Sequence, residues 1–184
     1  MRTEQEMFDL ILHTAREDAR IRAVYMNGSR TNKNVPKDIF QDYDIVYVVT
    51  ETKPFIEDKS WIDRFGERLF MQYPDECPDD PGDKENVYGW LMQFADGNRI
   101  DLHVESIPHA KENIQNDSLC MILLDKDAIL PPIPESNDSD YHIQKPSPAQ
   151  YHSVCNEFWW CLDNVAKGLW REEIPYVQDM LNFP

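Results

Sequence analysis

The segment from Tyr88 to Ile107 constrains the fold most, because its pattern is that of two strands joined by a tight turn. Two apolar runs, YGWLMQF and RIDLHVESI, flank the four residues ADGN. An Asp-Gly pair between apolar runs is a strong local signal for a β-hairpin, since glycine supplies the positive φ that a short turn requires. The chain must therefore contain at least one antiparallel pair of strands.

Further elements are expected on both sides of this hairpin. The capping-box pattern Thr3-x-x-Glu6 precedes apolar residues at helical spacing and predicts that a helix begins near Thr3. In the segment SWIDRFGERLFMQ, the apolar spacing predicts a second amphipathic helix with Ser60 as its N-cap. In total, helices are expected over residues 3–18, 60–72 and 109–117, and strands over residues 21–27, 42–50, 88–94, 99–107 and 119–127.

This order of elements predicts an α+β domain over residues 1–130, in which helices flank a mixed or mostly antiparallel sheet. Residues 131–146 are rich in proline, which removes backbone donors and fixes φ, and we expect them to form a linker. A long helix is predicted after the linker, with Ser147 or Ser153 as its cap. Residues 147–184 therefore predict the beginning of a helical C-terminal domain.

Acidic residues far outnumber basic ones. Lys plus Arg is 18 and Asp plus Glu is 34, so the formal net charge is −16. A surplus of this sign repels nucleic acid and attracts cations, including polycationic small molecules, although its commonest role is simply to keep a protein in solution. We therefore expect no nucleic-acid partner, and charge alone does not identify any other partner.

The sequence also predicts no association with a membrane. No apolar run approaches the roughly 20 residues that a membrane helix needs, and the first ten residues, MRTEQEMFDL, are too charged for a signal peptide. The four cysteines show neither disulfide nor metal-ligand spacing, which is typical of a reducing compartment. We expect a cytoplasmic protein.

The strand predicted over residues 42–50 begins with two carboxylates, Asp42 and Asp44, in the run FQDYDIVYVVT. Side chains alternate between the faces of a strand, so these two carboxylates point the same way and repel each other unless a cation lies between them. Oxygen ligands of this kind suit Mg²⁺, which keeps water and substrate phosphates in the rest of its shell. An isolated pair of this spacing is weak evidence, because turns and solvated strand ends produce many.

Two other features favour a phosphate site. The residues Gly28, Ser29 and Arg30 directly follow a predicted strand, where backbone amides, a hydroxyl and a guanidinium can bind phosphate, although a plain turn would have the same sequence. Asp101 interrupts the apolar pattern of RIDLHV, on the same face as Arg99 and His103. Asp101 is either a third carboxylate of the metal site or part of the solvent-exposed face of an edge strand.

Taken together, a Gly-Ser turn, an acidic pair two residues apart and a later lone aspartate resemble the signature of the nucleotidyltransferase superfamily of the DNA polymerase β type. Over nearly the whole chain, the sequence looks like the aminoglycoside 6-adenylyltransferases, also called streptomycin adenylyltransferases. The segments that carry this resemblance are GSRTNKN, FQDYDIVYVVT, DGNRIDL, LLDKD and CNEFWW with VAKGL.

The resemblance implies Mg²⁺-dependent transfer of AMP from ATP to a hydroxyl of a cationic aminoglycoside such as streptomycin, with pyrophosphate as the leaving group. It implies that Asp42 and Asp44 hold Mg²⁺, and that Asp101 is a further metal ligand or the base that takes the hydroxyl proton. It also implies that Gly28, Ser29 and Arg30 cradle the triphosphate.

Candidates of second rank lie near the linker and on the last predicted helix. Lys145 and Lys167 are candidates for phosphate contacts, and Glu157 is a candidate for the amines of the aminoglycoside or for an alternative base. Each also has the sequence context of an ordinary linker or solvated helix residue. The family continues into a larger helical domain that helps to build the acceptor pocket, so residues 147–184 are expected to be a truncated beginning of that domain. The oligomeric state is left open.

Two alternatives to the aminoglycoside hypothesis are compatible with the same motifs. One is a lincosamide-type or other small-molecule nucleotidyltransferase, which would share the acidic site and differ in the acceptor. The other is a non-catalytic nucleotide-binding protein, such as a toxin–antitoxin partner, although the intact set of three aspartates argues against a dead site.

Overall fold

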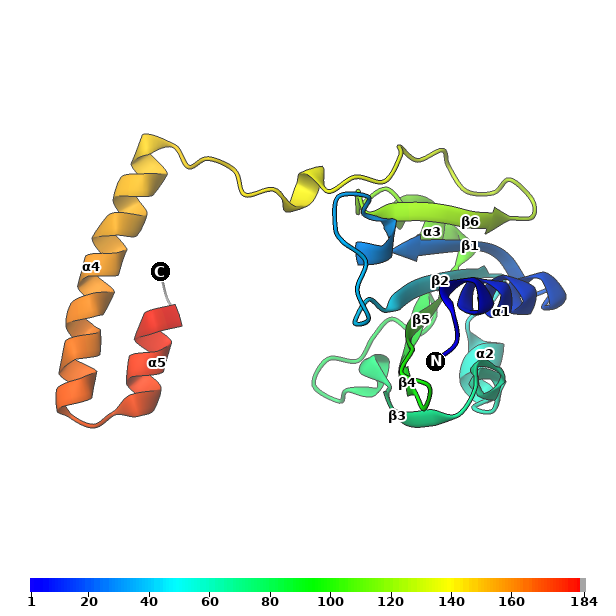
Figure 1. The fold of residues 1–184 in the computed structure, drawn as a ribbon, viewed down its shortest axis with the longest axis horizontal. Coiled ribbons are helices and arrows are strands. Elements are labelled where there is room, and N and C mark those ends of the chain that lie inside the picture. Colours follow the sequence, from blue (N-terminus) through cyan, green and yellow to red (C-terminus); the bar gives the residue numbers. More distant parts are fainter. Residues whose placement is uncertain (183–184) are drawn as a thin grey trace. The chain divides into compact units, whose positions relative to one another are not determined.

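A six-stranded mixed sheet organises the first part of the chain (Figure 1). The computed structural model describes residues 1–182, and its contacts divide the chain into one unit of Met1–Tyr141 and a second that begins at His142. The strands are β1 (Ile21–Asn27), β2 (Tyr43–Val49), β3 (Arg68–Gln72), β4 (Val87–Phe94), β5 (Arg99–Ser106) and β6 (Cys120–Asp125).

The strands are ordered β3-β4-β5-β2-β1-β6, and each neighbouring pair is antiparallel except β2 with β5, which is parallel. The predicted hairpin is β4–β5, and Gly97 in its turn has a φ of 88°. The predicted α+β class with a mixed sheet is therefore confirmed. The parallel pair has a consequence for the site, because it brings the starting ends of β2 and β5 to the same edge of the sheet.

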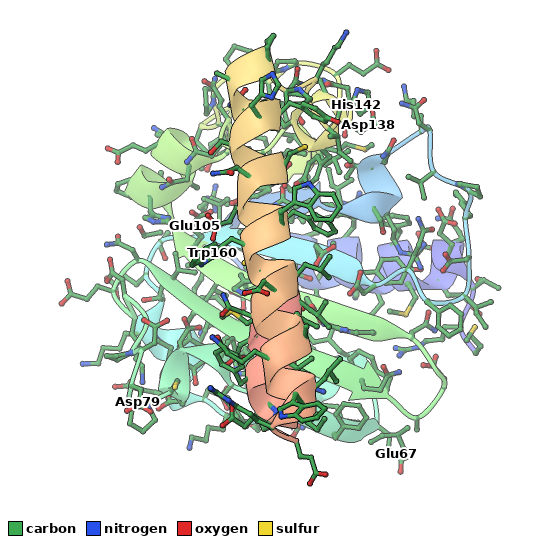
Figure 2. The ribbon with its side chains drawn as sticks, turned by 90° about the vertical axis from the view of Figure 1, so that its left-hand side faces the viewer. Glu67, Asp79, Glu105, Asp138, His142 and Trp160 are labelled. Carbon is green, nitrogen blue, oxygen red and sulfur yellow. The ribbon has the colours of Figure 1, made fainter. Side chains whose placement is uncertain are left out.

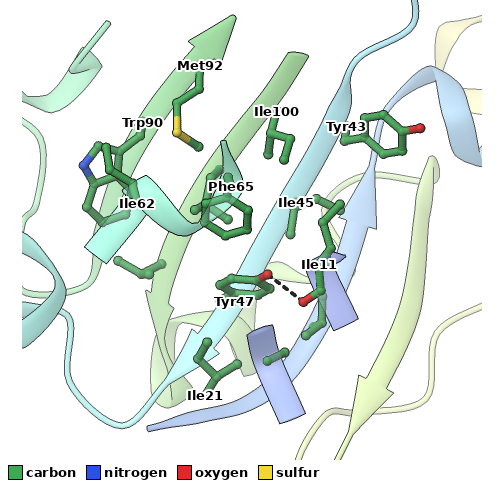
Figure 3. Close-up of a cluster of buried hydrophobic side chains, with 14 of the residues drawn as sticks. Ile11, Ile21, Tyr43, Ile45, Tyr47, Ile62, Phe65, Trp90, Met92 and Ile100 are labelled. Atoms are coloured by element: carbon green, nitrogen blue, oxygen red, sulfur yellow. Dashed lines mark hydrogen bonds between the residues drawn. The ribbon is translucent and has the colours of Figure 1, made fainter. Parts of the chain in front are cut away.

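One face of the sheet is covered by helix α1 (Glu4–Glu17), whose capping box joins Thr3 and Glu6 as predicted. The helix buries Met7, Ile11 and other apolar side chains against the sheet, and the Tyr47 hydroxyl donates a hydrogen bond of 2.8 Å to the Ile11 carbonyl (Figure 3). Burying one such side chain contributes about 1.5–3 kcal/mol. This packing makes β2 a rigid support for residues at its start.

The opposite face is covered in part by helix α3 (Ile107–Asn113), where Ala110 packs over Val46 and Val48. Glu105 is buried on this face (labelled in Figure 2), and it accepts a hydrogen bond from the Tyr25 hydroxyl and contacts Nδ1 of His109. A buried carboxylate is tolerated here because both of its oxygens have polar partners.

The helix predicted over residues 60–72 is wrong. The structure has a short helix α2 (Lys53–Glu57), a 3₁₀ turn over Trp61–Phe65, and then strand β3. Gly66 has a φ of 118°, which ends the turn, and the residues after it pair with β4 instead of continuing a helix. Ser60 does not cap a helix, because its hydroxyl donates to the Asp58 carboxylate at 2.6 Å.

The second unit contains helix α4 (Pro148–Trp170) and helix α5 (Ile174–Asn182). The predicted long helix is confirmed, and Ser147 is its cap, in a capping box with Gln150. Cys161, Val165 and Val177 are buried between the two helices, whereas Trp160 is largely exposed (Figure 2). Among the residues described, no helix combines the length and the apolar composition of a membrane span.

Part of the segment predicted as a linker packs on the first unit. Ile133 is partly buried against the cluster beneath α3, the Ser136 hydroxyl donates to Thr31 at 2.8 Å, and the Tyr141 hydroxyl donates to Asp117 at 2.9 Å. Residues up to Tyr141 therefore belong to the first unit.

Candidate active site

Three polar residues form a row across the sheet at the starting ends of β2 and β5. Asn27 of β1 pairs with Asp44 of β2, and Asp44 pairs with Asp101 of β5. Residues directly opposite each other in neighbouring strands project from the same face, so all three side chains share one face. Asp42, two residues before Asp44, joins them from the loop that enters β2.

The structure brings the three predicted carboxylates together. One oxygen from each of Asp42, Asp44 and Asp101 lies within 4.8 Å of the others. Tyr43 and Ile45, which alternate with Asp42 and Asp44 along the start of β2, are buried in the core on the other face. The predicted alternation is therefore confirmed.

Gly28 allows the close approach on which this cluster depends. Its φ is +77°, and a Cβ atom at this position would lie 2.1 Å from Oδ2 of Asp44. The Gly28 amide donates to the Leu119 carbonyl at 3.0 Å, which fixes the turn against the chain entering β6. A side chain on residue 28 would displace the Asp44 carboxylate or the turn itself.

The Asp44 carboxyl lies in an unfavourable electrostatic environment. Its pKa is raised to about 7, first because the group is buried and then because Asp42 and Asp101 repel its negative charge. A divalent cation among the three carboxylates would reverse this repulsion. The set offers only oxygen ligands, which suits Mg²⁺ better than a softer metal.

Asn27 is a site residue that the sequence reasoning missed. Its side-chain oxygen is buried and has no hydrogen-bond partner in the part of the chain that the structure describes, although it stands beside Asp44 in the row. An unpartnered acceptor is costly unless a ligand or a bound water satisfies it. Its position suits a metal-bound water or a substrate hydroxyl. Only the strand register could have identified it.

Arg99 also belongs to the site. Its Nε lies 2.7 Å from Oδ1 of Asp101 and its Nη2 lies 2.5 Å from Oδ2 of the same carboxylate, while Nε is 3.5 Å from Oδ2 of Asp42. One guanidinium therefore contacts two of the three acids. The sequence placed Arg99 on the face of Asp101, but it did not predict the contact with Asp42, which depends on the parallel pairing of β5 with β2.

Comparisons with known proteins agree with this geometry. A family model described as streptomycin adenylyltransferase matches residues 1–184.

The chain belongs to the streptomycin adenylyltransferase family.

Its relatives include proteins named aminoglycoside 6-adenylyltransferase from Bacillus subtilis (43% identical over 183 residues, 99% of this chain and 64% of the relative) and Campylobacter jejuni (44% over 184 residues, 99% and 63%). A crystal structure titled as an aminoglycoside 6-adenyltransferase from Bacillus subtilis superposes with a TM-score of 0.60 at 36% identity, covering 100% of this chain and 63% of that one. The chain thus spans less than two thirds of the length of these relatives.

Within this family member, Arg30 holds the loop that carries Asp42. Its Nε donates to the Asp42 carbonyl and its Nη2 to the Gln41 carbonyl, each at 2.7 Å, and the guanidinium stacks 3.8 Å from the centre of the Tyr43 ring. The predicted role of Arg30 as a phosphate ligand stays a prediction. The contacts seen here make it a clamp on the entry to β2.

Ser29 begins the 3₁₀ turn Ser29–Thr31 that directly follows Gly28. The predicted turn after the strand is therefore present, and it lies next to the row of polar residues because Gly28 touches Asp44. The role of Gly28 and Ser29 toward a triphosphate stays a prediction.

The remaining candidate site residues from the sequence lie in the second unit of the protein. Lys145 is exposed, Lys167 donates to Asn164 at 2.6 Å and lies 5.7 Å from the centre of the Tyr176 ring, and Glu157 accepts from the Cys161 thiol at 3.7 Å. Their predicted roles toward phosphate and aminoglycoside stay predictions.

Two hollows lie on the first unit, one toward each edge of the sheet from the acidic cluster, and the three carboxylates line neither of them. One lies on the β4–β3 side and is lined by Phe70, Leu91, Gln93 and Arg99, among others. The other lies on the β1–β6 side and includes Asp117, Ser118 and Cys120. The strand order thus puts one hollow on each side of the strands that carry the acidic cluster.

Proposed function

We propose that this protein transfers AMP from ATP to a hydroxyl of an aminoglycoside such as streptomycin, in a Mg²⁺-dependent reaction that releases pyrophosphate. The observation that carries the proposal is the convergence of Asp42, Asp44 and Asp101 within 4.8 Å beside a Gly-Ser turn. The names of the relatives support the choice of acceptor and of nucleotide.

In this reaction, the acceptor hydroxyl oxygen forms a bond to the α-phosphorus of ATP. The bond from that phosphorus to the bridging oxygen of pyrophosphate breaks, and the hydroxyl proton passes to a base. Transfer of this kind depends mainly on positioning and on neutralising charge. Mg²⁺, when bound, would supply that charge.

The residues divide this work in the following way. Asp42 and Asp44 hold the cation, and Asp101 is a further ligand or the base. Gly28 and Ser29 provide the turn over which the triphosphate lies, and Arg30 keeps Asp42 in place through the loop backbone. Asn27 offers an acceptor to a metal-bound water or a substrate hydroxyl.

The acceptor is proposed to be cationic. A net charge of −16 attracts a polycation toward the protein. Glu157 is proposed to bind its amines, and Lys145 and Lys167 to contact phosphate. We propose a cytoplasmic location, which the use of ATP as co-substrate and the four free cysteines support.

Pyrophosphate release tests the proposal. The full chain is mixed with ATP, Mg²⁺ and streptomycin, and the pyrophosphate that it releases is compared with that released by two variants, Asp42→Asn and Asp127→Asn. Asp127 is a surface carboxylate paired with Arg22 and serves as the control. We expect release by the wild type and by Asp127→Asn, and loss with Asp42→Asn or with EDTA. Release no higher than that of Asp42→Asn would refute the streptomycin hypothesis, and release only with a lincosamide would support the nearest alternative.

A further inference from the structure

We propose that Arg99 is a built-in counter-ion of the acidic site, which neutralises Asp42 and Asp101 while no divalent cation is bound and is displaced when one binds. The inference rests on the metal-dependent function proposed above. It concerns the side chain of Arg99 itself, and it makes a prediction about metal affinity that is opposite to that of a simple supporting residue.

The contacts of Arg99 are those of a competitor for the metal ligands. Nε and Nη2 donate to the two oxygens of Asp101 at 2.7 and 2.5 Å, so both oxygens of that carboxylate are engaged. Nε also lies 3.5 Å from Oδ2 of Asp42. A divalent cation bound by these carboxylates would use the same oxygens and would repel the guanidinium, which is a like charge at short range.

Arg99 is also free to withdraw. Its side chain is 46% exposed, and it lines the hollow on the β4–β3 side together with Phe70 and Gln93. A guanidinium that leaves the carboxylates can enter this hollow without disturbing the core, because Phe70 is itself 70% exposed at the sheet edge.

Arg30, the other arginine at the site, provides the contrast. Its side chain is only 12% exposed, two backbone carbonyls accept from it, and it stacks on the buried Tyr43 ring. Those partners do not change when a cation binds to side-chain carboxylates. The structure thus pairs a fixed arginine with a displaceable one.

If Arg99 instead held the carboxylates in a binding-ready arrangement, its removal would weaken metal binding. If it competes with the metal, its removal strengthens metal binding, at the cost of leaving the carboxylates without a counter-ion in the metal-free protein. The sign of the change in affinity therefore decides between the two roles.

The test is Mn²⁺ binding to the full chain, without nucleotide, measured by titration calorimetry or by the electron paramagnetic resonance of free Mn²⁺. We compare the wild type with Arg99→Gln and with Arg22→Gln. The second variant removes the same charge from a bidentate ion pair with Asp127, away from the site. Arg99→Gln is expected to bind Mn²⁺ about tenfold more tightly, which corresponds to the loss of one charge-assisted hydrogen-bonded pair. Arg22→Gln is expected to match the wild type.

Thermal unfolding gives a second readout. In EDTA, Arg99→Gln is expected to unfold at a lower temperature than the wild type, and Mn²⁺ is expected to raise its Tm by more than it raises that of the wild type. Arg99→Lys keeps the charge but cannot bind both oxygens of one carboxylate in the same way. Its Mn²⁺ affinity and its Tm are expected to lie between those of the wild type and of Arg99→Gln, and it replaces Arg99→Gln in the test if that variant does not fold.

The outcomes separate the two proposals. Absence of Mn²⁺ binding to the wild type, or equal binding to Asp44→Asn, would overturn the metal site itself. Binding to the wild type with unchanged or weaker affinity in Arg99→Gln would overturn only the role of Arg99. Equal tightening in Arg22→Gln would show a general effect of charge and would also overturn it.

Discussion

Gly28 and Asp44 are so close that a Cβ atom on residue 28 would lie 2.1 Å from the Asp44 carboxylate oxygen. The turn that begins at Gly28 and the carboxylate of Asp44 therefore form one structural unit. Glycine has no Cβ atom and tolerates the positive φ of +77°, and both properties let a carboxylate lie against the backbone.

Gly28→Ala is expected to weaken Mn²⁺ binding severely, because the new methyl group pushes Asp44 out of the cluster. It should also lose about 1–3 kcal/mol of stability through backbone strain. Calorimetry measures the first effect and urea unfolding the second. Gly97→Ala is the matched control, since Gly97 also has a positive φ of +88° but lies near the flexible Met1 side chain. It should lose stability and keep metal binding; equal loss of binding in both variants would contradict the argument.

Asp44→Asn is expected to stabilise the metal-free protein at high pH. The folded-state pKa of about 7 lies above the unfolded value near 3.8, so folding favours the protonated acid, and the wild type loses stability as the pH rises from about 4 to 7. The variant lacks this loss. Urea unfolding in EDTA should show Asp44→Asn more stable by about 1–3 kcal/mol at pH 8, after allowance for solvent screening, and much less so at pH 4.5. A difference that does not change with pH would contradict the raised pKa.

Arg30→Ala is expected to weaken metal binding through the backbone, because the carbonyls of Gln41 and Asp42 lose their shared donor and the loop loosens. The stability loss should be about 1–3 kcal/mol. Arg64→Ala is the control, since Arg64 also donates to a carbonyl, that of Trp61 at 2.6 Å, and stacks 4.6 Å from the Trp61 ring centre. The control should lose stability without losing Mn²⁺ affinity. Unchanged affinity in Arg30→Ala would refute the clamp.

Asn27→Ala is expected to leave the stability of the metal-free protein within about 0.5 kcal/mol of the wild type, because the amide oxygen it removes has no hydrogen-bond partner among residues 1–182. The variant should nevertheless bind the Mg²⁺ complex of a non-hydrolysable ATP analogue more weakly. Thermal shift with and without the analogue measures both effects. A large loss of stability with unchanged analogue binding would make Asn27 a structural residue.

The pair Asp42 and Asp44 was predictable because side-chain alternation is a local rule, whereas the meeting of Asp101 with that pair was expected only from the family resemblance. Alternation along one strand put Asp42 and Asp44 on one face, and the Asp-Gly turn predicted the hairpin that carries Asp101. The contacts of Asn27 and Arg99 were not predictable from local pattern. They depend on which strands lie beside β2 and in what register: Asn27 through the β1–β2 pairing, and Arg99 through the β2–β5 pairing, which joins segments more than fifty residues apart in the sequence.

The error at residues 60–72 has a different cause. The apolar residues Trp61, Ile62 and Phe65 are all buried, as an amphipathic helix would require. One turn of 3₁₀ helix satisfies the same spacing, and Gly66 with its positive φ then redirects the chain into an edge strand. A period of 3.6 cannot be distinguished from a single turn over so few residues.

The most direct test of the central claim is mass spectrometry of streptomycin after incubation with the full chain, ATP and Mg²⁺. We expect a product heavier by one AMP moiety, which is absent with EDTA and with Asp44→Asn and present with Asp127→Asn. Unmodified streptomycin with the wild type, or equal product with Asp44→Asn, would contradict it.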